Sequence, residues 1–113
     1  MRSITLKKLV ILAALLAPSF AAADSYILGA GRWTCEDLIQ AQQDEDWDKI
    51  YQAVGWLLGY WSAETRYRDD RFVDVVEQAG GRAIYDQTLV GCGQAPEGTL
   101  VYEIAQSMIK NTQ

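Results

Sequence analysis

Two cysteines and a set of carboxylates are the side chains of this sequence best suited to chemistry, because the chain contains no histidine. The lack of histidine excludes histidine-based catalytic triads, histidine metal sites and a histidine pH switch. Cys35 and Cys92 are suited to forming a covalent cross-link. The carboxylates are suited to cation binding, to acid–base catalysis or to a response to pH.

Three of the carboxylates alternate along the chain in the manner of a calcium loop: Asp44, Asp46 and Asp48. Such a loop needs glycine at its sixth position and glutamate at its twelfth, where this sequence has Lys49 and Gly55. Calcium binding is therefore not expected.

Enzymatic motifs are missing from the sequence as well. Fifteen acidic residues make a facing pair of carboxylates expected by chance, so they do not by themselves predict a glycosidase. The sequence has no glycine-rich phosphate loop, no nucleophile elbow and no aromatic and basic RNA-binding motif. We therefore expect a protein that is not an enzyme and that needs no cofactor or metal.

The first 23 residues have the layout of a cleavable signal peptide. Basic residues near the start precede an apolar run from Leu9 to Ala17, and small residues follow at Ala21–Ala23. A helix needs about 20 apolar residues to span a bilayer, so this run is too short to predict a permanent anchor. We expect cleavage after Ala23 and export of a single mature domain.

Removal of this leader changes the charge of the chain. Three of the ten basic residues lie in the leader and all fifteen acidic residues lie after it, so the formal charge changes from −5 to −8. Such a charge makes nucleic acid an unexpected partner. If every carboxylate were protonated, the same chain would be positive, so the sign of its charge reverses in acid.

Export also bears on the cysteines, because disulfides persist in oxidising compartments. We predict a bond between Cys35 and Cys92, with a free thiol or an intermolecular bridge as the alternatives. In the chain-entropy model, a loop of this length is stabilised by about 4 kcal/mol.

Periodicity predicts an all-α domain, a compact array of four to five short helices closed by one disulfide. Residues 24–33 show no helical period and are expected to form an irregular arm before a helical domain at 34–113. Thr34 and Asp37 predict a capped helix start, in a capping box that uses Asp in place of Glu. Further helices are expected over 47–61, from Asp69 or Asp70 to Gly80 and Gly81, over 82–92 and over 100–109.

The long helix has the clearest pattern in the sequence. Its apolar residues follow the i, i+3, i+4, i+7 rule and predict a stripe that faces the core: Trp47, Ile50, Tyr51, Val54, Leu57, Leu58 and Trp61.

The same helix also carries Trp56 and Tyr60 away from that stripe, with Gly55 and Gly59 one turn apart. A glycine inside a helix costs up to about 1 kcal/mol relative to alanine, so we expect another segment to approach the backbone closely there. That segment is either a part of the same chain, such as the arm or a later helix, or a second subunit.

An acidic run marks the start of the long helix: Asp44, Glu45, Asp46 and Asp48. Negative charges there are attracted by the positive end of the helix dipole. The plain interpretation is a solvated helix start. Protonation in acid would remove the stabilisation, which makes these four residues the predicted pH-responsive carboxylates.

Three features together resemble the HdeA/HdeB family of periplasmic acid-stress chaperones. They are the run Trp33-Thr34-Cys35-Glu36-Asp37-Leu38, the pairs Gly55-Trp56 and Gly59-Tyr60, and Cys92 followed by Pro96. The resemblance extends from about Trp33 to the end of the chain. The chain departs from the family in lacking a lysine-rich carboxyl-terminal tail and in the length of the segment between its cysteines.

This resemblance implies a periplasmic, disulfide-closed helical protein that forms a homodimer near neutrality. In acid such a protein loosens and binds unfolding periplasmic proteins without ATP. We assign the client or dimer surface to residues of the long helix and the helix after it: Gly55, Trp56, Gly59, Tyr60, Trp61, Phe72 and Val73.

A second resemblance, to the Tai-like immunity proteins, implies a different role. These are also small exported helical domains with paired cysteines. The chain would then be an inhibitor that binds one specific protein partner, a secreted toxin enzyme.

Overall fold

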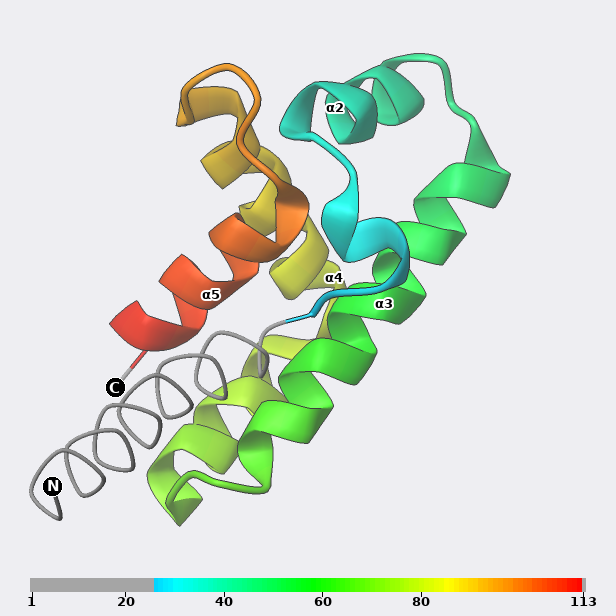
Figure 1. The fold of residues 1–113 in the computed structure, drawn as a ribbon. Helices are drawn as coiled ribbons and strands as arrows, with labels where there is room; N and C mark the ends of the chain where they lie inside the picture. Colours follow the sequence, from blue (N-terminus) through cyan, green and yellow to red (C-terminus); the bar gives the residue numbers. More distant parts are fainter. Residues whose placement is uncertain (1–25, 113) are drawn as a thin grey trace, which may run out of the picture.

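The computed structural model describes residues 26–112, and this part of the chain is helical (Figure 1). The elements are a 3-10 helix η1 (Gly29–Arg32), α2 (Cys35–Gln43), α3 (Trp47–Thr65), α4 (Asp70–Gln94) and α5 (Val101–Asn111). Within residues 26–112 the one β-type pairing is an isolated bridge between Thr34 and Leu100. The predicted all-α fold is confirmed.

The predicted leader, residues 1–23, lies outside the described residues, as do the first two residues of the arm. Over residues 26–112, no helix combines the length and apolar character needed to cross a membrane.

Helix α2 begins where the sequence predicts. The backbone N–H of Asp37 donates to Thr34 Oγ1 at 3.1 Å, and the N–H of Thr34 donates to Asp37 Oδ2 at 3.4 Å, which completes the capping box. At the other end, the N–H of Asp46 donates to the carbonyl of Ala41 at 2.9 Å, and Glu45 has φ 54°. This is a Schellman-type ending with a glutamate at the left-handed position that glycine usually occupies.

The disulfide joins the first residue of α2 to the end of α4, as predicted. The Cα atoms of Cys35 and Cys92 are 5.0 Å apart and both side chains are buried. Beside it, the N–H of Cys35 donates to the carbonyl of Thr99 at 2.8 Å, and the N–H of Val101 donates to that of Trp33 at 2.9 Å. The start of α5 is thereby placed against the start of α2 (Figure 1).

The apolar stripe of α3 is only partly in the core. Its buried line is Ile50, Ala53, Leu57 and Trp61. Three other predicted core residues are exposed: Trp47 by 50%, Tyr51 by 67% and Leu58 by 38%. The prediction was wrong for these three because α2 and α4 cover a narrower strip of α3 than its apolar residues span.

The two helices predicted on either side of Gly80 and Gly81 are present and meet at a kink, and together they form α4. Gly80 has φ 76° and ψ 170°, so the chain leaves the helical conformation where the sequence predicts an end. The helical conformation resumes directly after this residue. A Cβ on Gly81 would lie 2.8 Å from Leu58 Cδ2, so the bend also brings α4 close to α3.

The predicted irregular arm contains η1, which packs on the side of α3. The indole Nε1 of Trp56 donates to the carbonyl of Leu28 at 2.8 Å. A Cβ on Gly31 would overlap the Trp56 ring. The arm therefore covers Trp56, which is one of the two arrangements that the sequence left open.

No other segment of the described chain approaches Gly55 or Gly59, so the approach expected there is not made within this chain, and contact with a second subunit stays a prediction. Both glycines are exposed, and a Cβ at either position would have no atom within 4 Å in this structure. The close approaches lie elsewhere, at Gly31 against Trp56 and at Gly81 against Leu58. The arm meets the indole of α3 and leaves the backbone of that helix open.

This contrast yields a test of the packing on α3. Gly55→Ala and Gly59→Ala should each raise the free energy of unfolding by up to about 1 kcal/mol, because alanine is the better helix former. Gly31→Ala should lower it by about 1–3 kcal/mol, because its Cβ displaces the Trp56 ring. Urea unfolding followed by far-UV circular dichroism measures all three. A loss of stability in the first two variants would show that another surface covers them in solution.

Candidate functional site

A groove opens between the end of α2, the first half of α3 and the middle of α4. Its volume is about 260 Å³. We call it the aromatic groove, and its lining residues are Gln42, Trp47, Ile50, Tyr51, Val54, Arg82, Tyr85 and Asp86. A larger hollow of about 350 Å³ between α3 and α5 has a mostly polar lining, which includes the Arg68–Glu64 ion pair.

The α3 wall of the groove consists of two exposed aromatic residues. Trp47 and Tyr51 are one turn apart, with ring centroids separated by 6.1 Å and planes inclined by 32°. Half or more of each residue is exposed. Large aromatic side chains left open to water, with a concave surface beside them, are typical of a binding site.

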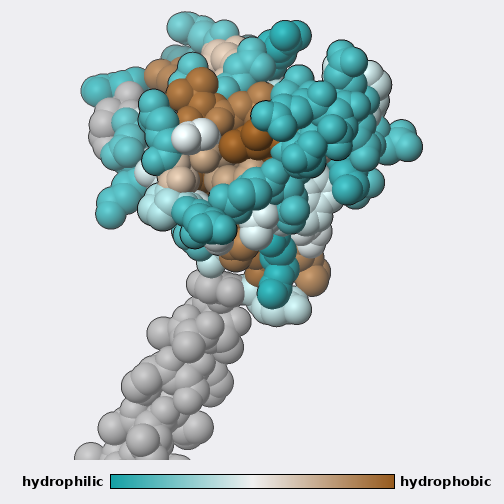
Figure 2. Space-filling model, turned by 90° about the horizontal axis from the view of Figure 1, so that it is seen from above, coloured by the Kyte–Doolittle hydropathy of each residue, from teal (hydrophilic) through white to brown (hydrophobic). Residues whose placement is uncertain are grey.

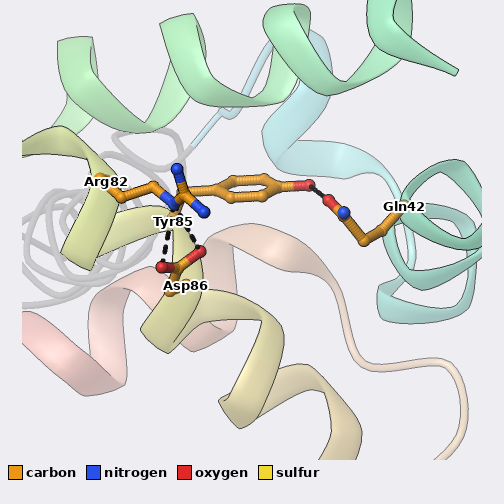
Figure 3. Close-up of polar contacts among 4 residues, drawn as sticks. All are labelled: Gln42, Arg82, Tyr85 and Asp86. Carbon is orange, nitrogen blue, oxygen red and sulfur yellow. Dashed lines mark hydrogen bonds and ion pairs between the residues drawn. The ribbon is translucent and has the colours of Figure 1, made fainter. Parts of the chain in front are cut away.

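The α4 wall consists of Tyr85 and an ion pair (Figure 3). The Tyr85 ring extends from α4 toward α2, where its hydroxyl donates to Gln42 Oε1 at 2.8 Å. Arg82 Nε donates to Asp86 Oδ2 at 3.1 Å. Because the Arg82 side chain is 89% exposed, this pair adds little to stability, and its main effect is to neutralise the cation at the rim.

Tyr85 is the titratable group that this environment perturbs. Burial raises the pKa of its phenol above the ordinary value of 10.0, and the negative charge of Asp86 raises it further. The hydroxyl therefore stays protonated at neutral pH and can serve as the donor to Gln42.

The four predicted pH-responsive carboxylates lie together at the junction of α2 and α3. Asp44, Glu45 and Asp46 lie between the lining residues Gln42 and Trp47, and Asp48 directly follows Trp47. Asp46 Oδ1 accepts the backbone N–H of Lys49 at 3.3 Å and caps α3. Asp44 Oδ1 accepts Gln40 Nε2 at 2.9 Å, and Asp48 lies in the first turn of α3. The acidic run therefore adjoins Gln42 and Trp47, two lining residues of the aromatic groove, along the chain.

Over residues 26–112, no group of three or more histidine, cysteine, aspartate or glutamate side chains is placed to hold a metal ion. Within the acidic run, Asp46 caps α3 and Asp44 bonds to the side chain of Gln40, as described above.

The predicted client or dimer residues fall into two separate clusters. Trp56 and Tyr60 stack at 4.8 Å between ring centroids, and the arm covers Trp56. Trp61 and Phe72 stack at 6.1 Å, buried between α3 and α4. Val73 is half-buried next to Phe72. Of the predicted set, only Gly55 and Gly59 are exposed in this structure.

Trp61 has one unusual feature. It is only 5% exposed, and its Nε1 has no hydrogen-bond partner within the described part of the chain. An unmade hydrogen bond of a buried donor costs about 1–3 kcal/mol. The indole thus contributes ring packing to the Trp61–Phe72 cluster, and the Arg68 guanidinium lies 4.7 Å from the centroid of the Phe72 ring.

Sequence reasoning missed the α4 wall of the aromatic groove. The sequence places Tyr85 in the helix expected over 82–92 and gives no link between this residue and Gln42. The i, i+4 spacing of Arg82 and Asp86 is readable from the sequence and indicates an ion pair. The contact of Tyr85 with Gln42 depends on how α2 and α4 pack, which periodicity does not give.

Neither protein-family models nor curated proteins nor solved structures give a match to this chain.

The raised pKa of Tyr85 predicts a loss of stability in alkali. The folded state favours the neutral phenol. The contribution of this group to the free energy of unfolding is therefore present below pH 10 and is lost as the pH rises through the raised pKa. Urea unfolding at pH 7 and at about pH 10.5 should show a smaller alkaline loss for Tyr85→Phe than for the wild type. At pH 7 this variant should be about 1 kcal/mol less stable, because the bond to Gln42 is lost.

Tyr51→Phe is the matched control, since its phenol is largely exposed. An alkaline loss in Tyr85→Phe equal to that of the wild type would contradict this assignment.

Proposed function

We propose that the mature chain is a periplasmic, ATP-independent acid-stress chaperone of the HdeA/HdeB kind. It binds unfolding clients through apolar surface that is covered at neutral pH. The proposal is supported above all by the two covered aromatic clusters, Trp56 with Tyr60 and Trp61 with Phe72.

The cover over each cluster is thin. Over Trp56 it is the four-residue η1 and the chain before it. Over Trp61 it is the first half of α4, which is separated from the second half by the bend at Gly80. Loosening would therefore expose aromatic surface in two places.

Hydrophilic residues cover most of the face seen in Figure 2 and surround a central patch of hydrophobic residues, and further hydrophobic residues lie at the lower edge of this view. The folded protein thus shows limited apolar surface on this side. A chaperone that acts only in acid requires this kind of surface at neutral pH, because an open apolar surface would promote self-association.

The caps of three helices provide a route by which acid would loosen the fold. The carboxylate of Asp37 accepts a backbone N–H at the start of α2. Asp46 does the same at the start of α3, and Asp69 at the start of α4. A protonated carboxyl is a weaker acceptor and no longer interacts with the helix dipole. Each cap contributes about 1 kcal/mol, so losing several together is significant for a domain of this size.

Two further features fit this mechanism. The Cys35–Cys92 bond would keep the loosened chain compact, since it restricts the conformations open to it. The positive charge that the chain gains in acid would keep its complexes with clients soluble.

The direct test is light scattering of an aggregating client, such as malate dehydrogenase, with and without the purified protein. We expect suppression at about pH 3 and none at pH 7, because the carboxylates are protonated only in acid. Trp56→Ser and Phe72→Ser should weaken suppression. A protein that suppresses aggregation at neither pH, or equally at both, would contradict the proposal.

The role of the caps has a separate test. Asparagine caps a helix about as well as aspartate but does not titrate, so Asp46→Asn with Asp69→Asn should leave stability at pH 7 within about 0.5 kcal/mol. The same double variant should unfold at a lower pH than the wild type, measured by circular dichroism during acid titration.

Asp74→Asn is the control for the second test, since it removes one charge from α4 beyond the capping position. It should shift the acid transition less than the double variant does. An unchanged transition in the double variant would show that the caps are not the acid-sensitive groups.

A further inference from the structure

We propose that the aromatic groove binds a short segment of another protein in which a lysine or arginine stands beside a large aliphatic residue, and that it does so at neutral pH. This inference rests on the groove alone and does not depend on the acid-chaperone proposal, which concerns surface that is covered at neutral pH.

The size of the groove favours side chains of a peptide over a small-molecule ligand. Its volume of about 260 Å³ lies below the range of roughly 300–1,000 Å³ that is typical of small-molecule sites. Ile50 and Val54 contribute apolar surface between the two walls. An aliphatic side chain inserted there would contact Trp47 on one side and Tyr85 on the other.

The charge around the groove selects the rest of the segment. The acidic run lies where α3 begins and adjoins the lining residues Gln42 and Trp47 along the chain. The one cation in the lining, Arg82, is already paired with Asp86. A lysine or arginine would meet carboxylates at that end and could lie over the exposed faces of Trp47 and Tyr51.

The same charges disfavour other occupants. A second copy of the chain would bring its own excess of acidic residues to this rim, since the sequence holds fifteen acidic and ten basic residues. An anionic ligand would be repelled for the same reason. A basic and aliphatic segment satisfies both the aromatic walls and the acidic end.

The experiment measures the anisotropy of a fluorescein-labelled peptide in which Lys-Leu pairs alternate with Ser-Gly spacers, titrated with the purified protein at pH 7. Trp47→Ala should weaken binding by about tenfold or more, the change expected for loss of an anchor residue. Asp44→Asn with Asp48→Asn should weaken binding about threefold to tenfold and flatten its dependence on salt. Replacing the lysines of the peptide by glutamate should abolish binding.

Tyr67→Ala is the matched control, because Tyr67 is 82% exposed and lies in the connection between α3 and α4, away from the groove lining. It should bind the peptide as the wild type does. Circular dichroism establishes that each variant is folded, and both Trp47 and Tyr67 are exposed enough for the substitutions to be tolerated.

Three results would overturn the proposal. They are no binding of the Lys-Leu peptide up to about 1 mM protein, equal binding of the glutamate peptide, and binding that Trp47→Ala leaves unchanged. Sedimentation that shows a dimer which Trp47→Ala dissociates would assign the groove to a second copy. Trp47→Ala should suppress client aggregation in acid as the wild type does, so failure of either proposal can be told from failure of the other.

Discussion

The antiparallel contact between α2 and α4 is the constraint on which the rest of the structure depends. The disulfide fixes this contact at Cys35 and Cys92. Gln42 follows Cys35 by seven residues, and Tyr85 precedes Cys92 by seven, so their hydrogen bond lies two turns, or about 10 Å, from the disulfide. Two fixed points along a pair of helices set their alignment. Helix α3 then packs across both, and its first turns form one wall of the aromatic groove.

This arrangement explains why the core is narrower than the apolar pattern of α3. A helix that packs against two neighbours buries the residues that face the gap between them, here Ile50, Leu57 and Trp61. Residues at the margins of the stripe, such as Trp47 and Tyr51, remain exposed. Their exposure costs hydrophobic free energy that burial would have gained. That cost is easier to understand if another molecule covers them.

The sequence predicted the structure correctly where a residue type favours one local conformation or one covalent bond. Thr34 with Asp37 predicted a capped helix start, Gly80 predicted a break in helical geometry, and the presence of two cysteines predicted their pairing. It did not give the surroundings of Gly55 and Gly59, because a glycine inside a helix does not tell whether the same chain or a second subunit approaches it, and no segment of the described chain does. The sequence also did not predict on which side of α3 the arm would lie. The position of the arm depends on the hydrogen bond between Trp56 and Leu28, which are 28 positions apart, and no periodic pattern encodes such a contact.

The bend at Gly80 has a consequence for how the molecule opens. Its φ and ψ values belong to a region that only glycine populates readily, so the helical hydrogen-bond ladder is interrupted there. Residues before the bend form a hairpin with the second half of α3, whereas residues after it are joined to α2 by the disulfide. We expect the hairpin to open locally before the segment that the disulfide holds. Amide hydrogens of the hairpin would exchange with solvent through local opening. Those near Cys92 would exchange more slowly, because their exchange requires a larger part of the chain to unfold.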